Sequence, residues 1–241
     1  MSQAIKSTEK KYTTAVILAA GIGSRFSSST PKQRVSILGK SLISRVAEAF
    51  YLCSDVDSIV VVTRDEDINF VNNELRFAID KLHAVISGGN CRAESARIGF
   101  MAVPLETTHV AIHDGARCLI QPKDISAVIR AAYDFGAASA ASRVVNTVKK
   151  ISQNNIVGTV SRDNLVFAET PQVFDYDIYK MAISSEYDPN SITDDNMLIE
   201  GIGQEISVVM LSEENPKITY PRDVDYAEFL LKRREKCLDI E

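Results

Sequence analysis

The sequence has no apolar stretch that approaches the roughly 18 residues needed to cross a membrane. Residues 1–12 are polar and lysine-bearing and lack the apolar core of a signal peptide, so we expect a disordered lead-in and a cytoplasmic protein. Positive charge is not in excess either: the net charge is −5, whereas nucleic-acid binding usually requires a broad basic surface. We expect no membrane and no nucleic acid among the partners. A small anionic substrate is compatible with this net charge, because Lys and Arg residues can form a positively charged pocket locally.

Cysteine and histidine are also scarce. The four cysteines form no C-x-x-C pair, and the three histidines do not cluster. This spacing argues against a structural zinc site. It favours reduced thiols, as is usual in the cytosol.

The first half of the chain alternates short, continuously apolar runs with amphipathic segments of helix length. The apolar runs are 14–19, 58–63, 82–86 and 109–113, and the amphipathic segments are 41–53, 67–80 and 92–103. This βαβ alternation predicts a Rossmann-like, three-layer αβα fold with a mostly parallel central sheet. Ligands of such sheets bind at the carboxyl ends of the strands. The loops after Ala19, Ile86 and Ile112 should therefore carry the site.

The pattern changes after Ala141. Segments 143–151 and 156–162 read as two strands around a polar turn, so we expect a β-hairpin arm over 143–165. Such an arm serves dimerisation or caps a site, or is only an edge ribbon, and spacing alone leaves these open. Helices over 176–185 and 194–201, a strand over 206–210 and a last helix over 221–236 should follow. The 241 residues suit one domain over 13–241.

The loop after the first strand carries the strongest chemical signal. Gly21 and Gly23 would let backbone N–H groups approach a phosphate chain closely, and Arg25 and Lys32 would add positive charge. A dinucleotide-binding fingerprint is excluded, because Phe26 stands where it requires glycine.

A second glycine-containing segment, 39–41, reads Gly-Lys-Ser like the end of a Walker loop. The required upstream glycine is replaced by Arg34, so this segment is predicted to be a turn.

Six motifs, in order along the chain from Val16 to about Ala227, resemble the sugar-phosphate nucleotidyltransferases. The chain is most similar to the cytidylyltransferase branch, typified by the 2-C-methyl-D-erythritol 4-phosphate and ribitol-5-phosphate cytidylyltransferases. The segments that carry the resemblance are 18–25 with 31–33, 88–95, 113–117, 170–174, 193–195 and 215–219.

The resemblance implies attack of an acceptor phosphate oxygen on the α-phosphorus of CTP. A phosphate monoester has its second pKa near 6 and is largely dianionic at neutral pH, so no general base is needed. The implied catalytic residues are Arg25 and Lys32 on the triphosphate side, with Arg162 and Lys217 gripping the acceptor phosphate. The implied nucleotide-binding residues are Ala19, Ala20, Gly21, Gly23, Gly88, Gly89, Asn90, Ser95, Asp114 and Arg117.

Asp114 ends the fourth predicted strand, where a carboxylate can reach Mg²⁺, the cofactor that the family implies. Its alternative role is to cap the next turn or to pair with Arg117. His113 is interpreted as a structural residue. Asp194 and Asp195 are interpreted as the start of a helix, where negative charge is favourable, rather than as metal ligands.

In the family, residues matching Thr147 and Arg162 of the arm reach the acceptor from the partner subunit, which implies a homodimer. Thr170 and Thr193 are further acceptor contacts or else turn and cap residues. The chain departs from the family at Asn146, where an aspartate is usual, and at Cys118, where a proline is usual. Both departures bear on substrate identity more than on reaction type.

We favour 2-C-methyl-D-erythritol 4-phosphate as the acceptor, a step in isoprenoid precursor synthesis. The preference rests on the Thr147-x-Lys149 hairpin, the segment 193–195 and family analogy. D-Ribitol 5-phosphate is the rival acceptor. A nucleotide-binding regulator without activity is disfavoured by the retained cations, and a nicotinamide-dependent oxidoreductase by Phe26.

Overall fold

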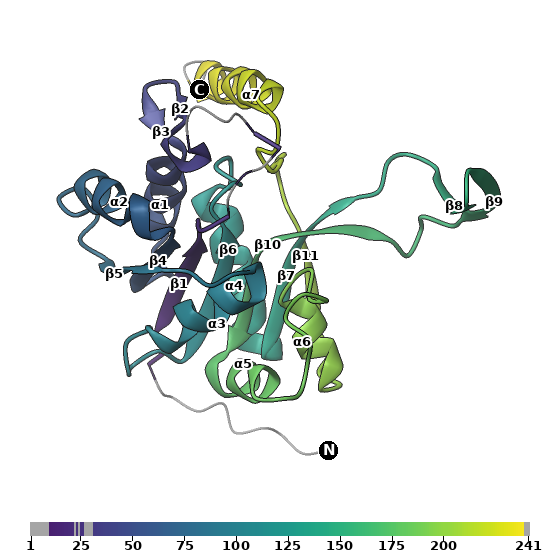
Figure 1. Ribbon diagram of the computed structural model, residues 1–241, viewed down its shortest axis with the longest axis horizontal. Helices are drawn as coiled ribbons and strands as arrows, with labels where there is room; N and C mark the ends of the chain where they lie inside the picture. Colours follow the sequence, from purple (N-terminus) through teal and green to yellow (C-terminus); the bar gives the residue numbers. More distant parts are fainter. Residues whose placement is uncertain (1–9, 22, 24, 27–30, 239–241) are drawn as a thin grey trace.

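A seven-stranded sheet lies in the middle of the molecule (Figure 1). The computed structural model describes residues 10–21, 23, 25–26 and 31–238, so most of the predicted lead-in lies outside the described residues. The strand order is β11-β7-β10-β6-β1-β4-β5, and only β10 runs antiparallel to its neighbours. The strands are β1 (Thr13–Leu18), β4 (Ser58–Thr63), β5 (Leu82–Ser87), β6 (His109–Asp114), β7 (Ala137–Arg143), β10 (Val166–Asp175) and β11 (Ser207–Met210). The predicted mostly parallel sheet is confirmed.

Helices cover both faces of this sheet, which explains why its strands are apolar on both sides. In β1, Ala15 and Ile17 join one buried core, and Val16 between them joins the other. The first core is covered by α1 (Leu42–Leu52), α2 (Ile68–Leu75), α4 (Pro122–Phe135) and α7 (Arg222–Leu238). The second is covered by α3 (Arg92–Met101), α5 (Tyr176–Ile183) and α6 (Asn196–Gly201). The three-layer architecture is therefore confirmed.

Two local features follow from turn and cap chemistry. Helix α4 starts with Pro122, whose missing N–H is not needed there, and is followed by Gly136, which has a φ of 80°. The segment that resembles a Walker loop is a tight turn between β2 (Ser36–Ile37) and β3 (Lys40–Ser41), with Gly39 at a φ of 78°. That turn was predicted.

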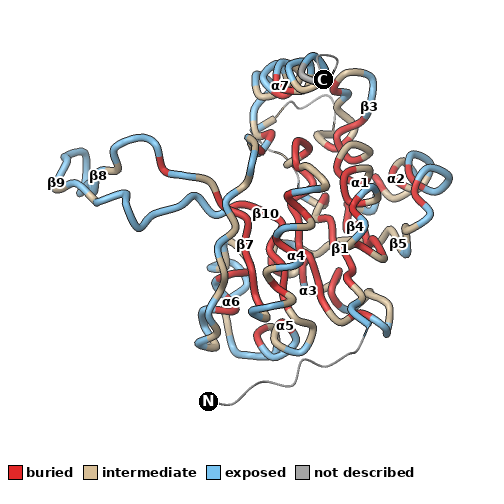
Figure 2. Tube along the Cα trace, turned by 180° about the vertical axis from the view of Figure 1, so that it is seen from behind, coloured by how far each residue is buried: buried red, intermediate tan, exposed pale blue. Residues whose placement is uncertain are grey.

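The predicted arm is present as a two-stranded antiparallel hairpin of β8 (Val148–Ser152) and β9 (Asn155–Val160). It projects from the body, and its residues are largely exposed, whereas the central strands of the sheet are buried (Figures 1 and 2). The first strand of the hairpin starts later than predicted, because Arg143 belongs to β7 of the main sheet. Within the described part of the chain, no helix has the length and apolar character to span a membrane.

Candidate active site

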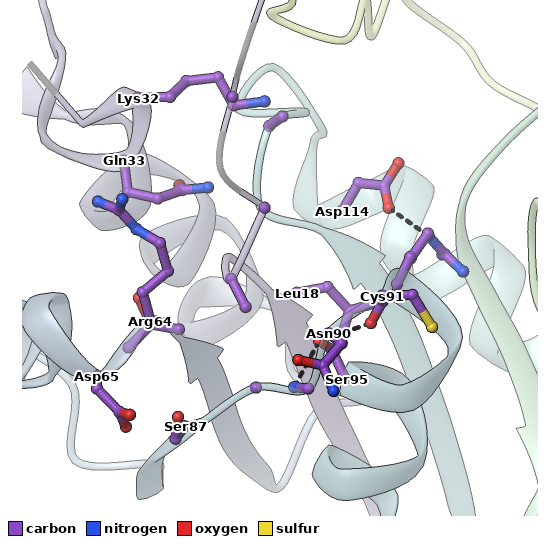
Figure 3. A pocket seen from close by; sticks show the side chains of 18 of the residues that line it. Leu18, Lys32, Gln33, Arg64, Asp65, Ser87, Asn90, Cys91, Ser95 and Asp114 are labelled. Atoms are coloured by element: carbon purple, nitrogen blue, oxygen red, sulfur yellow. Dashed lines mark hydrogen bonds and ion pairs between the residues drawn. The ribbon is translucent and has the colours of Figure 1, made fainter. Parts of the chain in front are cut away.

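A cavity of about 540 Å³ opens at the carboxyl ends of β1, β4, β5 and β6 (Figure 3). The loops after these strands meet there because the strands are parallel and adjacent. Many of the residues predicted to bind the nucleotide or the acceptor line this cavity. They are Ala20, Gly21, Gly23, Lys32, Gly88, Gly89, Asn90, Ser95, Asp114 and Lys217.

The wall after β5 is a close-fitting glycine loop. A Cβ on Gly88 would lie 2.5 Å from Ala20 Cβ and 2.8 Å from Ser95 Oγ, so only glycine fits. Ser95 Oγ accepts a hydrogen bond from the Gly89 N–H at 3.1 Å and donates to Cys91 O at 3.0 Å. These bonds fix the loop at the N-terminus of α3. The dipole of α3 favours an anion at this end of the helix.

Asp114 lies at the end of β6 among three cationic side chains. Its Oδ1 accepts from Arg92 Nε at 3.1 Å and its Oδ2 from Lys217 Nζ at 2.7 Å, while Arg117 Nε lies 3.9 Å from Oδ2. Burial alone would raise the pKa of Asp114, but Arg92 and then Lys217 outweigh burial and hold this pKa far below its usual value. The carboxylate is therefore ionised throughout the neutral range.

Lys32 brings a further positive charge to the same cavity. It lies on the short helix η1 (Lys32–Arg34), and its Nζ donates to Ile218 O at 3.3 Å. Burial, followed by the neighbouring Lys217, lowers the pKa of Lys32, and Asp114 partly opposes this. The two lysines repel each other, so an anion bound between them would relieve this repulsion.

Arg92 links the nucleotide loop to a segment far along the chain. Its Nη1 donates to Asp195 Oδ2 at 2.7 Å. Burial would lower the pKa of Arg92, but Asp195 and then Asp114 raise it above its ordinary value. Asp195 precedes α6, as predicted, yet it makes no capping hydrogen bond, because its side chain pairs with Arg92 instead.

A buried layer beneath Asp114 holds its loop in place. Thr170 Oγ1 accepts from the backbone N–H of Asp114 at 3.0 Å and also contacts His113 Nδ1 at 3.0 Å. His113 is fully buried, its Nε2 lies 3.1 Å from Arg117 O, and burial lowers its pKa to about 4. His113 is thus a neutral structural residue, in agreement with its sequence interpretation.

Three predicted site residues belong to the walls rather than to the cavity surface. Thr170 is buried under Asp114. Arg117 Nη1 donates to Glu169 Oε2 at 3.0 Å and to Asn215 O at 2.8 Å. Ala19 is fully buried, and its N–H donates to Val62 O at 2.7 Å. Their substrate contacts stay predictions.

Four other predicted residues lie outside the cavity lining and are exposed: Arg25, Thr147, Arg162 and Thr193. Arg25 is near enough to Lys32 to contribute to the lowering of its pKa. Thr193 donates to Met197 Sδ at 3.1 Å. Thr147 lies on the arm, and Arg162 follows β9 and donates from Nη1 to Val145 O. Their roles also stay predictions.

One wall of the cavity was not predicted from the sequence; it is formed by Thr63, Arg64 and Asp65 at the end of β4. The signal was available, since β4 was predicted as a parallel strand and its carboxyl end must lie at the same edge of the sheet. Arg64 is tied to Asp67, with Nε 2.9 Å from Oδ2, which fixes this wall.

Comparisons with known proteins identify the family of this chain. The model of the family described as IspD, 2-C-methyl-D-erythritol 4-phosphate cytidylyltransferase, matches residues 13–233. The enzyme of that name from Pelotomaculum thermopropionicum is 38% identical over 92% of this chain and 94% of its own length. Its namesake from Lachnospira eligens is 37% identical over 91% of this chain and 99% of its own length.

Solved structures show the same likeness. The 4-diphosphocytidyl-2C-methyl-D-erythritol synthase of Anaerococcus prevotii has a TM-score of 0.79 at 25% identity, covering 92% of this chain and 96% of that one. The Francisella tularensis 2-C-methyl-D-erythritol 4-phosphate cytidylyltransferase has a TM-score of 0.76 at 29% identity, and the match covers 91% of this chain and 99% of that one. Because the family model matches nearly the whole length of this chain, the chain belongs to the 2-C-methyl-D-erythritol 4-phosphate cytidylyltransferase family of nucleotidyltransferases.

Proposed function

We propose that this protein transfers the cytidylyl group of CTP to 2-C-methyl-D-erythritol 4-phosphate, in isoprenoid precursor synthesis. An oxygen of the acceptor phosphate forms a bond to the α-phosphorus of CTP. The bond between that phosphorus and the bridging oxygen to the β-phosphate breaks, and pyrophosphate leaves with the electron pair. No proton has to be removed, because the acceptor phosphate is largely dianionic at neutral pH.

The observation that carries this proposal is the cluster of Lys32, Lys217 and Arg92 around Asp114, beside a close-fitting glycine loop. Phosphoryl-group transfer needs little covalent chemistry from the protein. It needs positioning and stabilisation of the charge that spreads in the transition state. Fixed cations in a partly buried cavity supply this stabilisation without reorganising during the reaction.

The cavity suggests a direction for the bound nucleotide. Lys32, Lys217 and Arg92 gather around Asp114 at the end of β6, whereas the loop after β5 presents Gly88 and Gly89, beside Ser95. CTP would place its phosphates on the cationic side and its base and ribose on the glycine side. Lys32 would then hold the triphosphate, and Lys217 would guide the acceptor phosphate toward the α-phosphorus.

The family implies Mg²⁺, and the donor set here fits it. Mg²⁺ typically takes one or two protein carboxylates together with substrate phosphates and water. Asp114 supplies one ionised carboxylate at the cavity, although no group of three potential ligands occurs among the described residues. Asp114 would hold the ion, which would neutralise phosphate charge. The exposed Lys217 head group would release Oδ2 of Asp114 as the acceptor enters.

We further propose that the working unit is a homodimer in which the arm completes the partner's site. The arm carries exposed apolar side chains, among them Ile151, Ile156 and Val157. Thr147 and Arg162 accompany it outside the cavity of their own chain. A projecting apolar ribbon that bears a cation suits docking against a second copy near its acceptor phosphate.

A substrate panel tests the activity. Pyrophosphate release is measured with Mg²⁺ for CTP, UTP, ATP and GTP, each combined with 2-C-methyl-D-erythritol 4-phosphate or D-ribitol 5-phosphate. We expect release with CTP and the methylerythritol phosphate. If D-ribitol 5-phosphate is preferred, the proposed acceptor is wrong and the proposed reaction type stands. If no pair releases pyrophosphate, the proposed chemistry is refuted.

A further inference from the structure

The segment that leads into α6 places a fully buried carboxylate behind the site. Asp195 has no exposed surface, and its Oδ2 accepts from Arg92 Nη1 at 2.7 Å. Arg92 in turn donates from Nε to Oδ1 of Asp114 at 3.1 Å. A continuous line of contacts therefore runs from Asp195 through Arg92 to Asp114.

Asp195 is itself fixed from two other elements. The hydroxyl of the fully buried Tyr179 on α5 donates to its Oδ1 at 2.7 Å. Its backbone N–H donates to Gln172 Oε1, on β10, at 2.9 Å. The carboxylate that pairs with Arg92 is therefore buried and hydrogen-bonded on the side of α5.

Stability alone does not account for this arrangement. A buried ion pair is costly to desolvate, and apolar side chains of similar volume stabilise a core as well or better. A buried carboxylate that accepts two hydrogen bonds, as that of Asp195 does, holds the side chain paired with it in one orientation. Here that partner, Arg92, also contacts the Asp114 carboxylate at the end of β6.

The two oxygens of Asp114 are held differently as a consequence. Oδ1 contacts the half-buried Arg92, which also pairs with Asp195, whereas Oδ2 contacts the more exposed Lys217. Fixing one oxygen leaves the other in a defined place for substrate chemistry.

We propose that Asp195, supported by Tyr179, is a positioning residue that acts through Arg92 to orient Asp114 for the transfer reaction. This inference rests on the proposed function and adds a role for residues that touch neither substrate. Asp195→Asn keeps the size of the side chain and an acceptor for Tyr179 but removes the charge that holds Arg92. We expect kcat to fall at least tenfold, with less than a threefold change in the KM for CTP.

A double-mutant cycle separates positioning from general damage. Asp195→Asn, Arg92→Lys and the double variant are compared by kcat in the pyrophosphate-release assay, with thermal unfolding as a check of folding. If Asp195 acts through Arg92, the double variant loses no more than Arg92→Lys alone. Glu200→Gln, which removes an exposed carboxyl on α6, is the matched control and should keep kcat within twofold of wild type.

Two outcomes would overturn the proposal: losses that multiply independently in the double variant, or an Asp195→Asn enzyme within threefold of wild type. If Asp195→Asn does not fold, Tyr179→Phe keeps both charges and gives the same test. It should lower kcat three- to tenfold alone and cause no further loss with Arg92→Lys. A wild-type protein that releases no pyrophosphate would instead refute the proposed function.

Discussion

Replacement of Lys32 by alanine tests how the cationic cluster works. Lys32 is half-buried beside Lys217, and among the described residues its hydrogen-bond partner is a carbonyl oxygen, that of Ile218. Its charge is therefore available to a bound anion. Two unit charges about 4 Å apart interact by about 4 kcal/mol at an effective dielectric constant of about 20.

Only the part of that energy gained in the transition state accelerates the reaction. Loss of a single preorganised donor to developing negative charge typically costs about 10²–10³ in kcat. We expect Lys32→Ala to lower the single-turnover rate by about this factor. CTP binding should weaken by roughly tenfold or less, because removal of Lys32 also ends its repulsion with Lys217 in the ground state.

The assay compares single-turnover rates with equilibrium titration of CTP. Lys40→Ala is the matched control, since Lys40 is exposed, pairs with Glu48 and lies outside the cavity. A variant that binds CTP far more weakly but reacts at the wild-type rate once saturated would contradict the role assigned to Lys32.

Three further predictions concern the glycine loop, the buried histidines and the arm. Gly88→Ala should weaken CTP binding at least tenfold in a titration, because the new Cβ would collide with Ala20 and Ser95, whereas Gly158→Ala on the arm has open space and should not. Burial lowers the pKa of His109 and of His113 to about 4, so the folded protein is destabilised as these residues are protonated. In urea unfolding, the free energy of unfolding should fall from pH 6.5 to pH 4 by up to about 3 kcal/mol per histidine. A flat profile over this range would refute the prediction. Mixing inactive Arg162→Ala and Lys217→Ala subunits should restore part of the activity, and no recovery would count against a shared site.

The strands of the first half could be predicted because their chemistry is local. β1, β4 and β6 are short, largely apolar runs that are buried on both faces, and such runs have few other conformations that bury them, whereas β5 is a partly buried edge strand. Because these strands are parallel, the sequence alone predicts that the glycine loops and Asp114 lie at the same edge of the sheet, at the carboxyl ends of the strands.

Elements of the second half were harder to predict. β7 is a run of alanine and serine with low β propensity, and it becomes a strand through pairing with β10 and β11. Helix α4 was missed although Pro122 and Gly136 mark its two ends. α2 ends at Leu75, five residues before the predicted end, because an amphipathic pattern fixes helix boundaries poorly.

The support of the site could not be derived from spacing. Arg92 and Asp195 lie 103 positions apart, and only the packing of α5 and α6 against the sheet brings them together. From the sequence, Asp195 had a sufficient local explanation as the start of a helix. The structure shows that its side chain faces inward and pairs with Arg92.

The central claim is that the cations around Asp114 hold the triphosphate of CTP at the carboxyl ends of β1 and β6. A crystal structure of the protein with CTP and Mg²⁺ tests it most directly. The claim predicts the phosphates between Lys32 and Asp114, with the base against Gly88 and Ser95. Electron density for the triphosphate away from Lys32, or the base on the Asp114 side, would contradict it.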